Sequence, residues 1–365
     1  MRIKQIIDVM EELAPARFAE EWDQIGLQVG DREAEVDTVL VALTPSFEVL
    51  DEAAARGAGL VVSHHPLIFK PLVSLTGSTP SERLAAAFLK RDVALFAAHT
   101  NLDSAPGGVN DALARRLGLA NVQPLAPARI ALKKIVVFVP NGAIEEVAEA
   151  MCAAGAGNIG AYRDCTFRVK GTGTFTPTPQ AAPHIGTRGK SEHVVEVRIE
   201  SVVTDADVPG VVAAIRQSHP YEEPVFDIYH LENKSRESGP GRWGTLPEPV
   251  TAADFIAEVS NKLNTPGLRY AGDETRQVSK VAVCGGAGGD LYKDAIAHSC
   301  EVYVTADVSY HTFVDARDEG LLLVDAGHAE TELPGVGALR ERLAAKLGAA
   351  HVVLSERGRR AVRRL

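Results

Sequence analysis

The sequence predicts an α/β protein with two domains: a split outer α/β domain with a mostly parallel sheet, and an inserted ferredoxin-like (βαββαβ) α+β domain. Short apolar runs alternate with helical patterns in residues 1–126, and the same alternation returns in residues 280–347. The segment between them, 133–233, follows a different order. The length of 365 residues also exceeds one typical core, because domains average about 100–200 residues.

The outer domain is predicted to begin with an amphipathic helix at the N-terminus. In its first part we expect strands at 38–43, 59–63 and 93–98, with helices near 46–57, 80–91 and 108–118. In its last part we expect strands at 280–286, 301–307 and 321–327, with helices near 289–299, 309–319 and 334–347. Strands that alternate with helices predict parallel pairing, because a parallel connection needs a crossover.

The middle segment is expected to form strand, helix, strand, strand, helix, strand. These elements fall at 133–140, 143–154, 166–171, 194–203, 207–218 and 226–233. This order is the ferredoxin-like pattern, whose first and last strands are neighbours, so that its two ends lie close enough for insertion into another domain. We therefore predict an outer α/β domain of residues 1–126 with 246–365, and an inserted domain of residues 127–245. Residues 173–192 are expected to form a long loop, and 232–250 a linker back to the outer domain.

Composition excludes several classes of partner. The formal net charge of −10 disfavours a nucleic-acid partner, because phosphate backbones are held mainly by Lys and Arg. No apolar run approaches the roughly 20 residues needed to span a bilayer, and the N-terminus does not resemble a signal peptide. We expect a cytoplasmic protein with no membrane partner. The four cysteines show no C-x-x-C spacing and are expected to be reduced.

Two adjacent histidines, His64 and His65, follow the predicted strand 59–63. Inside a strand they would point to opposite faces. Pro66 favours an extended His65 and marks the end of the strand, which places both rings in a turn at the sheet edge. There they can converge on one metal or serve two metals, although solvated imidazoles at a polar strand end are an alternative.

Further candidate ligands follow two other predicted strands. Asp103 comes after 93–98, and His328 and Glu332 come after 321–327. If the chain is helical at His328, the spacing of four residues places it on one face with Glu332 and turns Glu330 elsewhere. Asp103 is alternatively a loop or capping residue, and Glu332 alternatively complements a helix dipole. The carboxyl ends of parallel strands are where α/β sheets bind ligands, which favours one shared site.

The donor set predicts the chemistry of this site. Three imidazoles and two carboxylates are too few to fill two metals, so positions stay open for water, as in catalytic sites. Mixed nitrogen and oxygen donors suit two divalent ions of Zn, Mn, Fe, Co or Ni, and argue against Ca or Mg alone.

The sequence also resembles the Nif-three-like family, whose members are named GTP cyclohydrolase I type 2 homologues. The resemblance rests on EEWDQIGLQVGD (20–31), SHHPLIFK (63–70), AHTNLD (98–103), AGAGNIGAYRDCTF (154–167), HPYEEPVFDIY (219–229), GRWGTLPEPV (241–250), VCGGAGGDL (283–291), TADVSYHTF (305–313) and DAGHAETE (325–332). It covers nearly the whole chain, with Gln24 where the family more often has Asn. The resemblance implies that the metal ligands are His64, His65, Asp103, His328 and Glu332. It also implies a homo-oligomer, expected to be a hexamer. The inserted domain is expected to be similar to ferredoxin-like signalling proteins.

Three other features are weaker candidates. His99 is expected near the site as a substrate contact or as a partner of a ligand, and His311 is a candidate general acid or base, with an exposed helical histidine as the alternative. The segment CGGAGGD (284–290) joins a predicted strand to a helix, so its amides are candidates for holding a phosphate, with a simple tight turn as the alternative.

Two functions remain open from the sequence. The first is a metal-dependent hydrolase acting on a small molecule, a nucleotide or a phosphoester, as the family name suggests. The second is a metal-binding regulatory or metal-delivery protein, in which the inserted domain senses a ligand. The second predicts metal binding without turnover.

Overall fold

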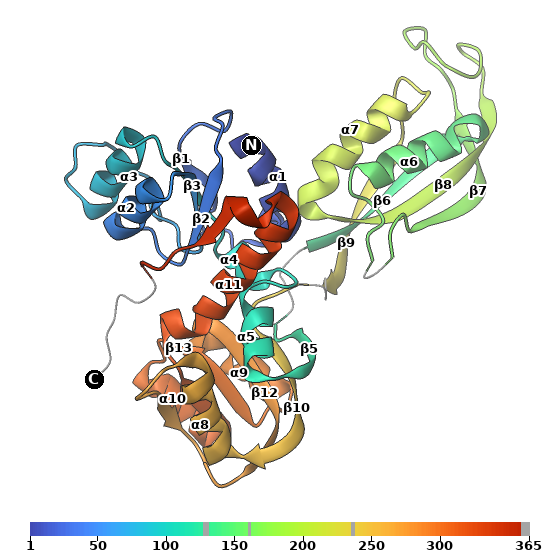
Figure 1. The fold of residues 1–365 in the computed structure, drawn as a ribbon. Coiled ribbons are helices and arrows are strands. Elements are labelled where there is room, and N and C mark those ends of the chain that lie inside the picture. Colours follow the sequence, from blue (N-terminus) through green and yellow to red (C-terminus); the bar gives the residue numbers. More distant parts are fainter. Residues whose placement is uncertain (127–130, 160–161, 235–237, 359–365) are drawn as a thin grey trace. The chain divides into compact units, whose positions relative to one another are not determined.

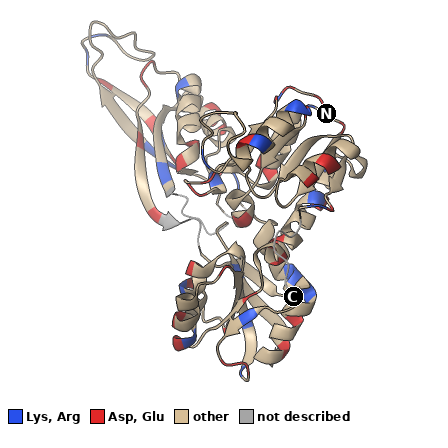
Figure 2. Ribbon diagram, turned by 90° about the vertical axis from the view of Figure 1, so that its left-hand side faces the viewer, with Lys and Arg blue, Asp and Glu red and all other residues tan. Residues whose placement is uncertain are grey.

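The computed structural model describes residues 1–126, 131–159, 162–234 and 238–358. Its internal contacts divide the chain into two units, Met1–Ala128 with Glu237–Leu365, and Arg129–Arg236. Both are mixtures of helices and strands (Figure 1). Basic and acidic residues are interspersed along the ribbon in Figure 2, and the net charge of −10 reflects an excess of acidic ones.

The first unit contains two sheets. One has the strand order β1-β4-β3-β2-β15, in which only the β1–β4 pair is antiparallel. Its strands are β1 (Gly26–Val29), β2 (Thr38–Ala42), β3 (Ala58–Ser63), β4 (Ala94–Ala97) and β15 (Val352–Leu354). The helices in this part of the chain are α1 (Ile3–Leu13), α2 (Phe47–Ala55), α3 (Pro80–Lys90) and α4 (Thr100–Ser104).

The other sheet has the order β11-β14-β13-β12-β10-β5 and is mixed. Only β12–β13 and β13–β14 pair in parallel. Its strands are β5 (Ala120–Pro124), β10 (Arg242–Thr251), β11 (Arg269–Ala271), β12 (Gln277–Ala287), β13 (Val302–Ala306) and β14 (Leu322–Asp325). The accompanying helices are α5 (Val109–Leu117), α8 (Ala252–Leu263), α9 (Tyr292–Ala297), α10 (Tyr310–Asp318) and α11 (His328–Leu347).

The first unit thus has two sheets where we expected one, and the expected mostly parallel pairing holds only in the first of them. The chain changes sheets twice: β5 pairs with β10 in the second sheet, and β15 returns through α11 to pair with β2 in the first. The long helix α11 makes this possible, because the apolar residues of its later turns, Val336, Leu339 and Leu343, pack into the core under β2 and β3. A separate core lies between α5, α8 and strands β12 to β14.

Two further boundaries differ from expectation. The segment expected to link the domains contains β10, whose first residues pair with both β12 and β5, so residues 242–251 belong to the first unit. The helix expected near 334–347 begins six residues earlier, at His328, and continues through Pro334. The hydroxyl of Thr331 supports the early turn by donating to the carbonyl of Gly327 at 2.9 Å.

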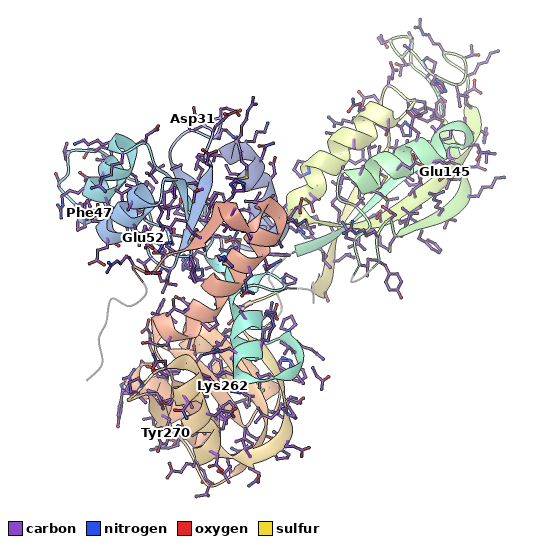
Figure 3. The ribbon with its side chains drawn as sticks, viewed as in Figure 1. Asp31, Phe47, Glu52, Glu145, Lys262 and Tyr270 are labelled. Atoms are coloured by element: carbon purple, nitrogen blue, oxygen red, sulfur yellow. The ribbon has the colours of Figure 1, made fainter. Side chains whose placement is uncertain are left out.

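Side chains fix several helix ends in the first unit. Ser46, Thr79, Thr251 and Ser309 each accept a hydrogen bond from a first-turn N–H of the helix that follows. The Glu52 carboxylate on α2 (Figure 3) accepts a hydrogen bond from the Ser355 hydroxyl at 2.6 Å, which holds the chain beyond β15. Single 3₁₀ turns lie at Ala16–Phe18, Asn141–Ala143, Asp205–Asp207, Gly289–Leu291 and Ala349–His351.

The second unit is one antiparallel sheet with two helices. Its elements in chain order are β6 (Ala131–Pro140), α6 (Ile144–Ala153), β7 (Thr166–Phe175), β8 (Glu192–Thr204), α7 (Val208–Ser218) and β9 (Phe226–Lys234), and the strand order is β7-β8-β6-β9. The core lies on one face of the sheet, where Val137, Val139, Ile199 and Val203 pack against apolar residues of both helices.

Among the described residues, no helix combines the length and the apolar character that crossing a membrane requires. All four cysteines are free, and Cys284 and Cys300 are buried.

Candidate metal centre

The adjacent histidines follow directly after β3. The backbone N–H groups of His64 and His65 continue to donate hydrogen bonds to the end of β2, which fixes both residues at the carboxyl edge of the sheet before Pro66 turns the chain away. His64 is fully buried, and its Nδ1 donates to the carbonyl of Ala98 at 2.9 Å. The Nδ1 of His65 lies 2.8 Å from the hydroxyl of Thr44. Both rings therefore turn Nε2 inward.

The first turn of α11 supplies two more side chains. Gly327 precedes it with a φ of +92°, a left-handed conformation that favours glycine. His328 Nδ1 donates to Asp307 Oδ2 at 2.6 Å, and its Nε2 lies 3.1 Å from Glu332 Oε1, as the helical spacing of four residues predicts. Glu330 instead lines a separate cavity on another side of the helix.

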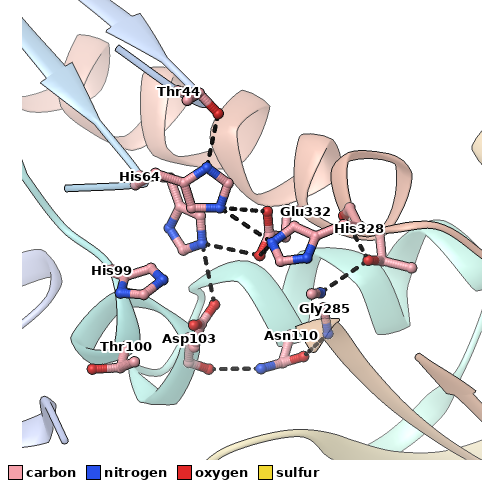
Figure 4. Close-up of polar contacts among 12 residues, drawn as sticks. Thr44, His64, His99, Thr100, Asp103, Asn110, Gly285, His328 and Glu332 are labelled. Carbon is pink, nitrogen blue, oxygen red and sulfur yellow. Dashed lines mark hydrogen bonds and ion pairs between the residues drawn. The ribbon is translucent and has the colours of Figure 1, made fainter. Parts of the chain in front are cut away.

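Asp103 comes from the short helix α4, after β4. Asn110 on α5 donates to the backbone carbonyl of Asp103 at 3.0 Å and accepts the N–H of Gly285 at 2.8 Å (Figure 4). This amide therefore ties α4 to strand β12 of the second sheet. The Asp103 carboxylate is left to face His64, with Oδ1 at 3.6 Å from Nε2.

All five predicted ligands meet at one place (Figure 4). The carboxylate of Glu332 is central, because Oε1 lies 3.4 Å from His64 Nε2 and Oε2 lies 3.0 Å from His65 Nε2. The Nε2 atoms of His65 and His328 are 3.3 Å apart. His64 and Glu332 lie deep, whereas the His65 and His328 side chains are 21% and 37% exposed, so the site is reachable from one side.

Three buried polar atoms in this cluster make ion-pair contacts of 3.0–3.6 Å but no hydrogen bond: His64 Nε2, Asp103 Oδ1 and Glu332 Oε2. Such atoms are rare, because leaving a buried polar atom unpaired costs about 1–3 kcal/mol. Here His64 Nε2 faces both Asp103 Oδ1 and the Glu332 carboxylate, whose Oε2 faces His65, and each of the three is an atom type that ligates metals. Metal-ligating histidines also commonly donate their other ring nitrogen to a carbonyl or carboxylate, as His64 and His328 do. The residues therefore fit a divalent metal.

Two overlapping groups of side chains have ligand atoms close enough to hold a metal ion. They consist of His64, His65 and His99, and of His65, His328 and Glu332. His65 belongs to both groups. His99, which we expected beside the ligands, thus lies within reach of His64 and His65.

The charges of the cluster are strongly coupled. Burial acts to lower the pKa of His64, but the carboxylates of Asp103 and Glu332 raise it to about 9. The hydrogen bond and the charge of Glu332 likewise raise the pKa of His328 to about 9. Burial raises the pKa of the Asp103 carboxyl to about 6, and burial also lowers the pKa of His65. The negative charge of these carboxylates, which raises the pKa of two imidazoles, also attracts a divalent cation.

The glycine segment at the end of β12 packs against the ligands rather than presenting free amides. Gly286 has a φ of +66°, and a Cβ there would lie 2.3 Å from Glu332 Oε1. The N–H groups of Gly285, Gly286 and Gly288 already donate to side chains of Asn110, Thr331 and Thr305. The suggested phosphate-holding role is therefore not supported, and close packing explains the glycines.

Replacing Gly286 with alanine is expected to push the Glu332 carboxylate aside and to weaken metal binding by about 10–100-fold, the usual effect of disturbing a ligand's support. Elemental analysis after dialysis against defined metal concentrations measures it. Gly289→Ala is the matched control, because a Cβ there meets nothing closer than 3.9 Å. Equal metal occupancy in the two variants would contradict the packing role of Gly286.

Asp307 orients His328 and was not among the predicted site residues. It lies just beyond β13 with a φ of +53°, and its carboxylate is 57% exposed. Asp307→Asn is expected to lower metal affinity by about 10–100-fold, because the neutral amide holds the imidazole less firmly. Asp318→Asn is the control, since that carboxylate pairs with Arg317 on α10. A competition titration with a chromogenic chelator measures both variants, and unchanged affinity in Asp307→Asn would rule out this role.

Of the two catalytic candidates, one lies at the site. The His99 ring packs against those of His64 and His65, with centroids 5.2 and 5.7 Å apart. His311 is exposed in the first turn of α10 and contacts the ring of Tyr310, and no contact between described residues joins it to the cluster. The candidate role of His311 therefore gains no support.

Asp23 holds His99 and was missed in the sequence. Its Oδ1 accepts the His99 Nδ1 hydrogen at 2.9 Å, and its Oδ2 accepts the N–H of Thr100 at 3.0 Å. Burial acts to raise the pKa of Asp23, but these hydrogen bonds and the charge of His99 lower it to about 2. Trp22, beside it in the sequence, packs edge-on against His99.

Comparison with known proteins gives a consistent result. A family model described as Duf34/NIF3 (NGG1p interacting factor 3) matches residues 1–358. A Halalkalibacterium halodurans protein named GTP cyclohydrolase 1 type 2 homolog is 43% identical over 324 residues, which are 88% of this chain and 87% of that protein. A Bacillus subtilis protein of the same name is 42% identical over 339 residues, 93% and 91% of the two chains. The crystal structure of a Bacillus cereus protein related to NIF3 covers 100% of this chain and 99% of its own, with 40% identity and a TM-score of 0.83.

Proposed function

Because this chain belongs to the Duf34/NIF3 family, we propose that it is a di-metal-binding hydrolase acting on a nucleotide or another phosphoester. The observation that carries the proposal is a cluster of three buried atoms that can ligate a metal and make no hydrogen bond, on His64, Asp103 and Glu332. The relatives' name refers to GTP, which supports a nucleotide as the class of substrate.

The five side chains His64, His65, Asp103, His328 and Glu332 would hold two divalent ions. Glu332 is the best candidate to serve both, because its two oxygens face different imidazoles. The donors suit Zn, Mn, Fe, Co or Ni, and leave positions for water and substrate. When bound, such ions supply Lewis acidity that activates water and stabilises developing negative charge.

His99 is the residue of this chain best placed to move a proton. The ionised Asp23 carboxylate fixes the Nδ1 hydrogen of His99, which leaves Nε2 to accept or deliver a proton at substrate. The exposed ring of Trp22 lies beside His99 and packs against the exposed ring of Phe69, with centroids 5.7 Å apart, so the two rings offer apolar contact to a planar group.

A screen of nucleotides and phosphoesters with metal-loaded protein tests the proposal. Turnover is expected with metal and is lost on chelation. His99→Gln is expected to keep the metal and to hydrolyse the substrate about 10²–10⁴-fold more slowly, the usual contribution of general acid–base catalysis. If metal-free protein and the His64→Ala variant both hydrolysed a substrate as fast as the metal-loaded wild type, the mechanism would be overturned.

The second candidate is a metal-binding regulatory or delivery protein whose inserted domain senses a ligand. One observation favours it: residues 129–236, which we propose to be an inserted ferredoxin-like domain, have a core and a cavity of their own, neither of which hydrolysis requires. In that case the screen would find bound metal and no turnover on any substrate.

A further inference from the structure

The second unit, Arg129–Arg236, is called the inserted unit from here on. It contains a cavity of about 410 Å³ on the side of its sheet away from the helices. Ile199 and Val203 on β8 face the helical core, so Glu196, an odd number of positions away, points to the opposite face. The loop between β7 and β8 and the turn before β9 contribute the other walls. The volume lies within the range of about 300–1,000 Å³ that is typical of small-molecule sites.

A buried carboxylate faces this cavity. Glu196 is 8% exposed, and its Oε1 accepts the Tyr221 hydroxyl at 2.9 Å. No hydrogen bond or ion pair among the described residues engages Oε2. The Arg198 guanidinium, two residues along the same strand, pairs with Glu200 instead. Burying a carboxylate without a cation is costly, so Glu196 is suited to meet one from outside.

The surrounding chain is built to keep this carboxylate in place. Gly173 on β7 has no side chain where a Cβ would lie 2.2 Å from Glu196 Oε2. His219 donates from Nε2 to the carbonyl of Phe138 at 2.9 Å and accepts the N–H of Tyr221 at Nδ1, at 3.1 Å. With Nδ1 occupied as an acceptor, His219 is held neutral, and burial lowers its pKa accordingly. It therefore positions Tyr221 without neutralising Glu196.

The walls combine apolar surface with negative charge. Its apolar lining includes Phe138, Phe175, Pro177, Ile185 and Val225. Glu222 and Glu223 lie at the same cavity, and its described lining holds no lysine or arginine and one histidine, the exposed His184, whose ring contacts Tyr221. The rings of Phe175 and Tyr221 meet at 62° with centroids 6.2 Å apart, an arrangement that presents aromatic surface to an ammonium group.

We propose that this cavity binds a small organic cation: an apolar body that fills the hydrophobic walls, with an amine that pairs with Glu196. The inference concerns the inserted unit alone, and it holds whether the metal centre hydrolyses a substrate or only binds metal.

The test uses the full-length, metal-loaded protein and three probes that share a phenylethyl body: 2-phenylethylamine, 2-phenylethanol and 3-phenylpropionate. Ligand-detected NMR titration measures binding of each. The amine is expected to bind about 10–100-fold more tightly than the alcohol, the usual effect of a hydrogen bond to a charged group, and the carboxylate more weakly still.

Substitutions in the cavity test whether the amine of the probe binds at Glu196. Glu196→Gln keeps the shape and the acceptor for Tyr221, and is expected to abolish the preference for the amine over the alcohol. Glu145→Gln is the matched control, because that exposed carboxylate pairs with Arg168 and belongs to α6, on the opposite face of the sheet (Figure 3). Val225→Trp, at a position 60% exposed, is expected to block all three probes without disturbing the buried carboxylate.

Thermal melting confirms that each variant is folded before its titration is interpreted. Equal binding of the alcohol and the amine, or an unchanged preference in Glu196→Gln, would overturn the proposal. Neither result would bear on the metal centre, whose ligands all belong to the other unit.

Discussion

Glu332→Gln is expected to lose most of its bound metal while remaining folded. The Glu332 carboxylate faces the Nε2 atoms of His64, His65 and His328, at distances from 3.0 to 3.4 Å. The amide removes the charge that draws a cation and leaves at most one oxygen donor. The loss of affinity should exceed the roughly 10–100-fold that follows from changing a residue that merely orients a ligand.

The measurement is metal content per chain by elemental analysis, together with a thermal melt. Glu341→Gln is the matched control, because Glu341 lies on the same helix but is exposed. Full metal occupancy in Glu332→Gln would show that the buried carboxylate is not a ligand.

Removing the metal with a chelator is expected to lower the melting temperature of the protein. The ligands come from the first sheet and from α11, which begins after the second sheet, so a bound ion ties the two parts together. An ion present at 100 times its dissociation constant stabilises the folded state by about 2.7 kcal/mol. For a domain of this size, that corresponds to a shift on the order of 5–10 °C.

Differential scanning calorimetry with and without chelator measures this shift. The Glu332→Gln variant provides the comparison, because a protein that holds no metal there should melt at the same temperature in both conditions. A wild-type melt that does not respond to chelator would contradict a structural contribution of the ions.

The local parts of the site could be predicted from the sequence. His328 and Glu332 are four residues apart, a spacing that converges in any helix, and Pro66 ends the strand before it can separate His64 from His65. Such arguments depend on a few neighbouring residues, and the structure brings these side chains together. Asp103 was also placed correctly at the carboxyl end of its strand.

The partners that orient these side chains could not be found in the same way. Asp23 and His99 are 76 positions apart, and Thr44 and His65 are 21 apart, so no local pattern connects them. Asp307 offered a signal, because it is the last residue of the predicted strand 301–307, whose carboxyl end lies at the ligand-binding edge. It was not among the residues predicted for the site.

The division into two sheets was likewise beyond local patterns. The strand β5 has mostly exposed or half-buried residues and lacks the apolar run of a central strand, and β10 lies in a Gly- and Pro-containing segment typical of loops. Both become strands only because they pair with each other and with β12. Pairing between distant segments overrides the local preference in each case.

The central claim, a metal centre built from His64, His65, Asp103, His328 and Glu332, is tested most directly by elemental analysis of wild-type protein purified without added metal. Up to two divalent ions per chain are expected, and a His64→Ala, Glu332→Ala double variant prepared in parallel should hold almost none. A wild-type protein with no more metal than the double variant would contradict the claim.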